Sequence, residues 1–269
     1  MPLTLFQARV FAVIAAARSE ASYLAGGAAL HLAPTGTRFS NDIDLFHNTA
    51  GAANLAFAAD ATSLRVAGLT VDVVAAFEGF VKARVSDATG ATEIDWAHES
   101  AWRFLPLVPI PGGGVMLHPI DLAINKLIAL AGRREPRDLV DILYADEHIL
   151  PFPALIWAVV EKNPGLNPAS YLEQFRRRTL TPEDAMFLRT TGAYDVAVAA
   201  ARFRALVAAA DAFIAANTAR EPGMLLQDTR TGEFVAPLTP EEWSHIRLHY
   251  GALGGVVPHA ADVSLRESV

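Results

Sequence analysis

Residues 37–48 read "TRFSNDIDLFHN", and the middle of this stretch alternates between acidic and apolar residues. Because successive side chains of a β-strand point to opposite faces, Ile43 and Leu45 would share one face and Asp42 and Asp44 the other. Burying unpaired carboxylates is costly. The pattern therefore predicts a strand whose apolar face covers a core and whose acidic face binds something that offsets its charge.

A divalent cation is the natural partner for two carboxylates at this spacing. The rise of a strand places the Cα atoms of Asp42 and Asp44 about 7 Å apart. Side chains at that separation can share two metal ions about 4 Å apart. Hard oxygen ligands suit Mg²⁺ or Mn²⁺. The pair thus predicts a site for one of these metals.

The segments on either side of this strand add to the prediction. Upstream, "YLAGGAAL" (residues 23–30) passes from a strand through Gly26 and Gly27 into a helix, whose free backbone N–H groups could cradle a phosphate. Downstream, "TEIDWA" (residues 92–97) is a second strand with acids on one face. Asp95 is the candidate third carboxylate, which would share a metal and deprotonate an attacking hydroxyl. Strand register decides whether Asp95 or Glu93 fills that role.

Hydrophobic periodicity and turn residues predict an α+β protein. Helices are predicted over residues 4–18, 28–33, 50–66, 118–134 and 136–148, and strands over residues 22–25, 42–46, 69–77, 80–87, 91–97 and 115–118. Beyond residue 151 the chain is predicted to be mostly helical, with a hairpin over residues 224–238 and a helical stretch over residues 239–250. We expect a head with a mixed sheet flanked by helices (residues 1–112) and a mainly helical domain (residues 113–269) that completes the active site.

Composition limits the function further. The chain has 269 residues, 52% of them hydrophobic, which is typical of an ordered globular protein. A net charge of -7 argues against coating nucleic acid by bulk electrostatics but leaves room for a local basic patch. The absence of cysteine excludes disulfides and thiolate zinc sites. The apolar run at residues 10–17 suits an amphipathic helix better than a signal peptide, and charges interrupt the run at residues 196–217. We expect a cytoplasmic protein without membrane contact.

Two blocks of sequence resemble a known family. Residues 24–45, "LAGGAALHLAPTGTRFSNDIDL", resemble the signature of the DNA polymerase β-type nucleotidyltransferases, and the Arg-x-Ser-x-Asp-Ile-Asp-Leu form resembles the AbiEii/AbiGii abortive-infection toxins. Residues 121–143, "DLAINKLIALAGRREPRDLVDIL", resemble the helical motifs of that branch. By match, Lys126 would contact the nucleotide triphosphate and Asp138 would complete the active site. Many members have Ser where this chain has Gly27, so that position offers its amide but no hydroxyl.

The resemblance implies a fold, a reaction and partners. It implies a metal-dependent nucleotidyltransferase that uses Mg²⁺ or Mn²⁺ and transfers NMP from an NTP to a hydroxyl, releasing pyrophosphate. The acceptor would be RNA, such as the 3′ end of a tRNA, and the protein would be the toxin of a toxin–antitoxin system with a separately encoded antitoxin. The expected catalytic residues are Asp42, Asp44, Asp95, Lys126 and Asp138, the expected metal ligands are Asp42, Asp44 and Asp95, and the expected nucleotide-binding residues are Gly26, Gly27, Arg38, Ser40 and Lys126.

Each of these features also has an ordinary structural interpretation. An Asp-x-Asp pair can sit at a solvated strand end, a Gly pair can serve a tight turn, and Lys126 can extend its stem along an apolar surface. Either Asp138 or Asp141 could be a first-turn acid that interacts with the helix dipole. The basic residues at 133–137 and 175–178 could be solvated helix faces or RNA contacts. His31 is expected to be an ordinary helix residue, and Trp243, His245 and Tyr250 to lie in the core or at its rim.

Two other classes of function remain open at this level. A nucleotidyltransferase that modifies a small molecule or a protein hydroxyl would use the same metal site. A non-catalytic binding module would keep the fold, but intact Asp42, Asp44 and Lys126 argue against it.

Overall fold

A seven-stranded mixed sheet forms the head of the molecule. The computed structural model describes residues 3–260. The strand order is β3-β4-β5-β2-β1-β8-β7, with β2/β5 and β1/β8 parallel and the other pairs antiparallel. The strands are β1 (Ser22–Ala25), β2 (Asp42–His47), β3 (Thr70–Phe77), β4 (Phe80–Asp87), β5 (Gly90–His98), β7 (Val108–Pro109) and β8 (Val115–Met116).

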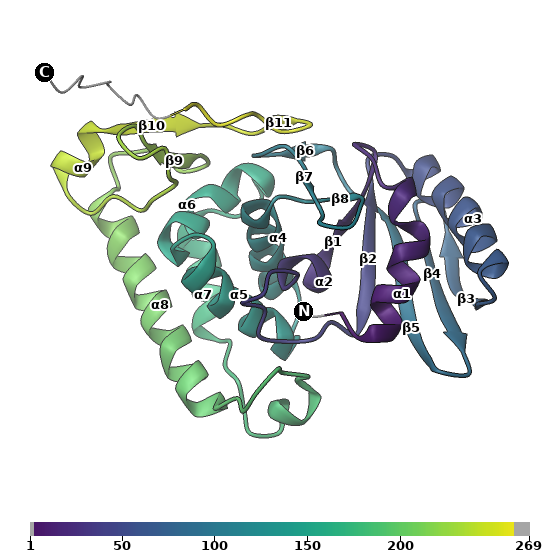
Figure 1. The fold of residues 1–269 in the computed structure, drawn as a ribbon. Coiled ribbons are helices and arrows are strands. Elements are labelled where there is room, and N and C mark those ends of the chain that lie inside the picture. Colours follow the sequence, from purple (N-terminus) through teal and green to yellow (C-terminus); the bar gives the residue numbers. More distant parts are fainter. Residues whose placement is uncertain (1–2, 261–269) are drawn as a thin grey trace, which may run out of the picture.

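Helices cover the two faces of this sheet unequally (Figure 1). On one face, α1 (Leu5–Ile14), which continues into the 3₁₀ turn η1 (Ala15–Ala17), packs with α3 (Ala50–Val66) against β4 and β5. Ile43 and Leu45 are fully buried in this core, as the alternation along β2 predicts. The other face of β2 carries its acids and meets the short helix α2 (Gly26–Leu30).

The helical half packs around a second buried cluster. Its helices are α4 (Pro119–Gly132), α5 (Pro136–His148), α6 (Phe152–Lys162), α7 (Pro168–Arg176) and α8 (Val196–Ala216), with the 3₁₀ turn η2 (Asp184–Phe187) before α8. Pro in the first turn opens α4, α5, α6 and α7, where its missing N–H is not needed. Fully buried side chains such as Leu127, Phe152 and Tyr171 form the core of this half.

The α+β architecture confirms the predicted fold class, whereas the division at residues 112/113 stays a prediction. β8 lies beyond that boundary yet belongs to the sheet, and Leu122 and Tyr144 join the core of the head. In the part of the chain that the structure describes, no single helix is long and apolar enough to cross a membrane; α5 and α6 qualify only as a pair, bent by 116° at their break.

The last part of the chain corrects one prediction. Residues 239–250 begin as a helix, α9 (Pro240–Ser244), with a capping box at Thr239, but continue as the strand β10 (Ile246–His249). That strand pairs antiparallel with β9 (Leu225–Asp228), so the expected hairpin within residues 224–238 is reduced to a single bridge between Gln227 and Phe234. A short pair, β6 (Trp102–Arg103) and β11 (Ala252–Leu253), follows.

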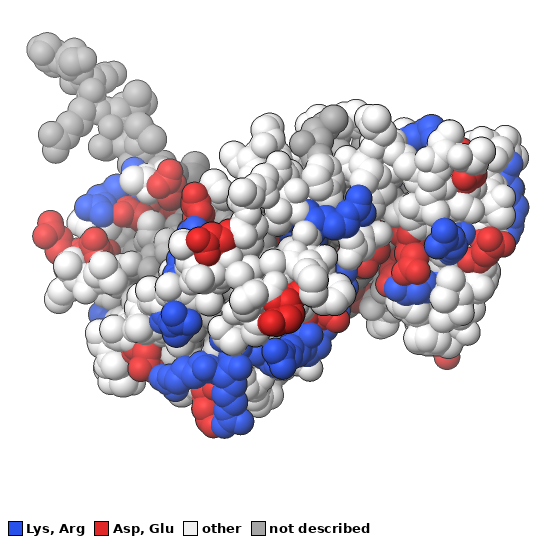
Figure 2. Space-filling view, turned by 90° about the horizontal axis from the view of Figure 1, so that it is seen from below, with Lys and Arg blue, Asp and Glu red and all other residues white. Residues whose placement is uncertain are grey.

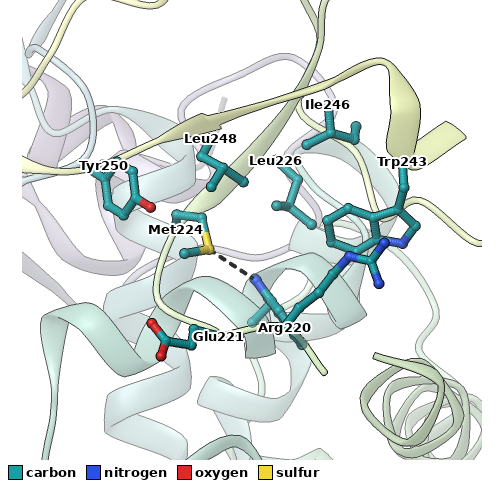
Figure 3. A pocket seen from close by; sticks show the side chains of 9 residues that line it. Arg220, Glu221, Met224, Leu226, Trp243, Ile246, Leu248 and Tyr250 are labelled. Atoms are coloured by element: carbon teal, nitrogen blue, oxygen red, sulfur yellow. Dashed lines mark hydrogen bonds between the residues drawn. The ribbon is translucent and has the colours of Figure 1, made fainter. Parts of the chain in front are cut away.

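The reason for this change is an apolar cluster around Trp157, which lies in the middle of α6. Its indole nitrogen donates to Met224 Sδ at 3.3 Å. Leu226 and Ile246, from the paired strands, pack against Trp157. The guanidinium carbon of Arg220 lies 4.1 Å from the centre of the Trp243 ring (Figure 3). Tertiary pairing therefore overrides helical spacing here. Trp243 is half-buried and Tyr250 is 51% exposed, so the first lies at the rim of the core and the second on the surface.

Candidate active site

Four carboxylates share one face of the sheet, at the neighbouring strands β2 and β5. The parallel register places Asp44 opposite Asp95 and Asp42 opposite Glu93. We call these four side chains the acidic face. The side chain of Glu93 is 45% exposed and that of Asp95 only 16%. The register thus brings Asp95, rather than Glu93, beside the less exposed position of Asp44.

Two cations and a hydroxyl already contact the acidic face. Lys82 Nζ lies 3.1 Å from Asp95 Oδ1 and 3.4 Å from Glu93 Oε2. Arg137 Nη1 lies 3.4 Å from Asp42 Oδ2, and the Ser40 hydroxyl donates to Asp42 Oδ1 at 3.0 Å. Ser40, predicted to touch the nucleotide, is thus placed to orient Asp42.

Neither Lys82 nor Arg137 was predicted to contact these carboxylates. For Lys82 the signal is present in the sequence. It alternates with the buried Val81 and Ala83 on a strand that a tight turn joins to residues 91–97, so pairing alone would place it beside an acid.

The carboxylates of the acidic face repel one another. Burial raises the pKa of Asp44 to about 6, and the charge of Asp42 adds to this effect, while Lys126 and Arg137 oppose it. Burial also raises the pKa of Asp95, against the opposing contact with Lys82. The protein thus holds more negative charge here than its own cations neutralise, as expected where a cation or a proton is bound.

The first residue of α2 lies directly against Asp44. Gly26 has φ +65°, and a Cβ built on it would come within 1.7 Å of Asp44 Oδ2. A Cβ on Gly27 would lie 2.5 Å from Arg38 Nη2 and 3.2 Å from Ser40 Oγ. Glycine at both positions therefore lets the start of α2, whose first N–H groups have no partner within the helix, approach the acidic face.

Gly26→Ala should lower the free energy of unfolding by about 2 kcal/mol, because alanine must adopt a left-handed backbone conformation and displace Asp44. Urea unfolding followed by circular dichroism measures the change. Gly51→Ala is the matched control, since a Cβ at this exposed position in α3 meets no atom within 4 Å. Equal stabilities of the two variants would contradict the close packing of Gly26 on Asp44.

A cavity of about 180 Å³ lies beside Asp44, between the sheet and α4. It is lined by Gly26, Asp44, Phe46, Leu122, Asn125, Lys126, Ala129 and Arg133. We call it the donor cavity. Burial alone would lower the pKa of Lys126, but the charges of Asp141 and Asp138 outweigh it and raise that pKa. Lys126 is therefore a permanent cation in the wall of the cavity, as its predicted contact with a triphosphate requires.

Asp138 and Asp141 lie behind this wall rather than on the acidic face. Asp138 is fully buried and accepts from Arg133 at 2.7 and 3.1 Å and from Lys126 at 3.3 Å. It therefore holds two cations of the donor cavity in place. The predicted role of Asp138, to complete the active site, stays a prediction.

Asp141 organises a second buried network and corrects a prediction for Arg38. Asp141 accepts both Arg38 nitrogens at 2.6 and 2.7 Å, His31 Nε2 at 2.8 Å, and the Lys126 ammonium at 2.8 Å. Arg38 was predicted to bind the nucleotide, but it is only 2% exposed and its guanidinium is occupied by Asp141. Arg38 and His31 therefore fix α5 to the segment that precedes β2, and sequence spacing could not reveal a pairing across about a hundred residues.

The acids of this face fit a metal that arrives with its substrate better than a preformed cage. Within residues 3–260, no three His, Cys, Asp or Glu side chains are arranged to hold a metal ion by themselves. Mg²⁺ is commonly held by one or two carboxylates together with substrate phosphates. Asp42 and Asp44 supply such a pair, and Asp95 Oδ1 is buried without a well-oriented hydrogen bond from any described residue.

Comparison with known proteins agrees with the class that this geometry defines. A mixed sheet with paired strand carboxylates, a glycine-opened helix against them and a cation-lined cavity are the features expected of a nucleotidyltransferase. The family model for the nucleotidyl transferase AbiEii toxin of type IV toxin–antitoxin systems matches residues 10–252. The chain belongs to this family, which confirms the resemblance, makes NTP its substrate and implies a cognate antitoxin. No curated protein matches the chain.

Three solved structures are similar to this chain at 16% identity. A putative nucleotidyltransferase from H. pylori covers 78% of this chain and 93% of its own (TM-score 0.46), and JHP933 from Helicobacter pylori covers 79% and 92% (TM-score 0.47). MenT4, a nucleotidyltransferase toxin from Mycobacterium tuberculosis, covers 76% and 82% (TM-score 0.48).

Proposed function

We propose that this toxin transfers NMP from an NTP to a hydroxyl of an RNA acceptor, such as the 3′ end of a tRNA, with the help of Mg²⁺ or Mn²⁺. The observation that carries the proposal is the position of the acidic face, with its excess negative charge, next to a cavity lined by Lys126 and Arg133. Nucleotidyl transfer needs both sides of this arrangement, because a metal-bound triphosphate must be held while a hydroxyl attacks it.

The cations of the donor cavity would hold the triphosphate. Lys126 and Arg133 line the cavity and are kept in place by Asp138, which bonds to both. The backbone amides at Gly26 and Gly27 would add hydrogen bonds to phosphate oxygens. Asp42 and Asp44 would hold the metal, which when bound would neutralise charge on the reacting phosphate and the leaving pyrophosphate.

The acceptor hydroxyl would react beside Asp95. Its oxygen forms a bond to the α-phosphorus on the side opposite the leaving group, and the bond from that phosphorus to the pyrophosphate oxygen breaks. Asp95 accepts the proton of the attacking hydroxyl. Lys82, which contacts Asp95 at 3.1 Å, would hold this carboxylate until the site is loaded.

Metal dependence and acceptor class can be tested in one assay. Purified protein is incubated with each α-labelled NTP and total RNA in a buffer that contains Mg²⁺, and RNA of tRNA size should become labelled. Chelation of the metal with EDTA before the reaction should prevent this labelling. Restored transfer on adding excess Mg²⁺ or Mn²⁺ is the control for damage by EDTA. Transfer that persists in EDTA would contradict the metal-dependent mechanism.

The same assay separates the alternative functions. Asp44→Ala should abolish labelling, because it removes a proposed metal ligand. Label that moves only to a small molecule or to protein would overturn the RNA acceptor while leaving the transferase intact. No transfer to any acceptor under these conditions would overturn the proposed reaction.

A further inference from the structure

A second cleft opens near Asp42, at residues that do not line the donor cavity. It has a volume of about 470 Å³. Its lining includes Asn41 next to Asp42, Arg134 just before α5, Arg137 in the first turn of α5, and Phe187 of η2. We call it the arginine cleft. Its lining shares no residue with that of the donor cavity. Because Arg137 lies 3.4 Å from Asp42, the cleft borders the acidic face directly.

The lining of the arginine cleft combines two arginines with an exposed aromatic ring, and it also carries the acids Glu135 and Asp184. Arg134 is exposed and makes no ion pair or hydrogen bond to another side chain in the described part of the chain. The Nε–H of Arg137 is buried and donates to no acceptor within residues 3–260, and Glu135 Oε2 lies 3.7 Å from it. Phe187 is 72% exposed, although aromatic rings of this size are usually covered. Exposed arginines beside an aromatic ring are the elements with which proteins hold single-stranded nucleic acid.

Folding brings a second basic cluster to the same place. Arg178, just after α7, lines a smaller hollow together with Arg134, so the arginines at 133–137 and at 176–178 meet although some forty residues separate them. Figure 2 shows Lys and Arg side chains gathered on the lower edge of the helical half. Two acids share this surface: Glu135 lies 3.7 Å from Arg137, and Asp184 accepts from the Thr181 amide. Six arginines thus lie on two short segments of a chain whose net charge is -7.

We propose that the arginine cleft binds the unpaired terminal nucleotides of the RNA acceptor. Arg134 and Arg178 contact its phosphates, a base stacks on Phe187, and the terminal hydroxyl is directed to the acidic face. The identity of the acceptor rests on the proposed function. The position of the cleft supports the acceptor rather than the donor, because the donor cavity beside Asp44 has its own cations, Lys126 and Arg133, and shares no lining residue with the cleft.

Binding measured without NTP tests the cleft separately from the reaction. The probe is a fluorescent single-stranded RNA of twelve nucleotides and mixed sequence, with its affinity measured by anisotropy over a range of salt concentrations. Phe187→Ala should weaken binding about tenfold through lost stacking. Arg134→Ala should reduce the slope of log affinity against log salt by about 0.7, the value for one phosphate contact on a single strand. Circular dichroism establishes that these surface variants are folded.

Matched controls come from equally exposed residues elsewhere. Phe77→Ala removes a ring that is 63% exposed on the edge strand β3, and Arg65→Ala removes an exposed arginine in the last turn of α3. Neither should change RNA affinity more than twofold. The proposal would be overturned if the RNA did not bind the wild-type protein. It would also be overturned if the RNA bound Phe187→Ala and Arg134→Ala as tightly as it binds wild type. A raised KM for NTP with unchanged RNA affinity would also overturn it, by assigning the cleft to the donor. Intact RNA binding without transfer would count against the proposed function and leave the cleft standing.

Discussion

Asp44→Asn is expected to abolish nucleotidyl transfer and, in metal-free buffer at pH 7.5, to raise the free energy of unfolding by about 2 kcal/mol. The activity falls at least about 1000-fold, because a metal contributes several kcal/mol of transition-state stabilisation and each 1.36 kcal/mol is a factor of ten. The stability rises because the same carboxylate is unfavourable in the empty site. Carboxylates that are placed to bind a cation are expected to lower the stability of the folded protein when no cation is bound.

The sign follows from the pKa of Asp44, which burial and the neighbouring Asp42 raise from 3.8 to about 6. Below pH 4 the carboxyl is protonated in both the folded and the unfolded state. Between pH 4 and 6 only the folded state keeps the proton, so stability falls as the pH rises. Above pH 6 Asp44 is ionised in both states, and its charge destabilises the folded state. The rise of its pKa from 3.8 to about 6 corresponds to about 3 kcal/mol, which partial solvent exposure reduces to about 2 kcal/mol.

Urea unfolding at pH 4 and pH 7.5 measures this difference, which should vanish at the lower pH. Asp72→Asn, an exposed acid on β3, is the control and should alter stability by less than about 0.5 kcal/mol at either pH. Adding Mg²⁺ with an NTP should stabilise wild type and not Asp44→Asn. An Asp44→Asn protein that is less stable than wild type at pH 7.5 would contradict the repulsion among these carboxylates.

Much of the head could be predicted because its signals are local. The alternation of Asp42, Ile43 and Asp44 defines a strand with one buried face, and the glycine pair before it marks a close backbone approach, which the 1.7 Å overlap at Gly26 explains. The resemblance to the family rests on residues 24–45, which contain both of these signals, and on residues 121–143. The placement of Asp95 follows once the two acidic strands pair in parallel.

The parts that could not be predicted depend on contacts between distant segments. Helical periodicity places Asp138 and Asp141 on the same face of α5, but it does not say that one meets Arg133 while the other meets Arg38. Residues 246–249 have the spacing of a helix and become a strand because β9 offers them a partner. The arginine cleft likewise forms where the start of α5 meets η2, two segments about fifty residues apart in the sequence.

Asp141→Asn should lower the free energy of unfolding by about 4 kcal/mol at pH 7, the cost of leaving buried cations without their counter-charge. Asp141 is fully buried and accepts from Arg38, His31 and Lys126. Urea unfolding measures the loss. Glu147→Gln is the control, because Glu147 lies on the same helix as Asp141 but is exposed, where it pairs with Arg202 of α8. This change should lower the free energy of unfolding by less than about 1 kcal/mol.

A double-mutant cycle can measure how much of this loss of stability comes from the ion pair between Asp141 and Arg38. In the double variant Arg38→Met/Asp141→Leu an apolar pair replaces an ion pair, so its destabilisation should be about 2 kcal/mol smaller than the sum of the single changes. Strict additivity would contradict a direct energetic link between the two residues. Lys126 keeps Asp138 as a partner in each variant, so this cycle reports mainly on Arg38.

The pH dependence of Asp141 should be opposite to that of Asp44. Burial would raise the pKa of Asp141, but the charges of Arg38 and Lys126 outweigh it and hold that pKa well below its ordinary value. The contribution of Asp141 is therefore complete above pH 4 and is lost as the pH falls further. The gap between wild type and Asp141→Asn should narrow below pH 4, where protonation weakens the wild-type network. A gap that stays constant from pH 7 to pH 3 would mean that Asp141 acts through packing and not through its charge. Asp141 thus stabilises the folded site through its charge, whereas Asp44 is the acid that we propose binds the metal.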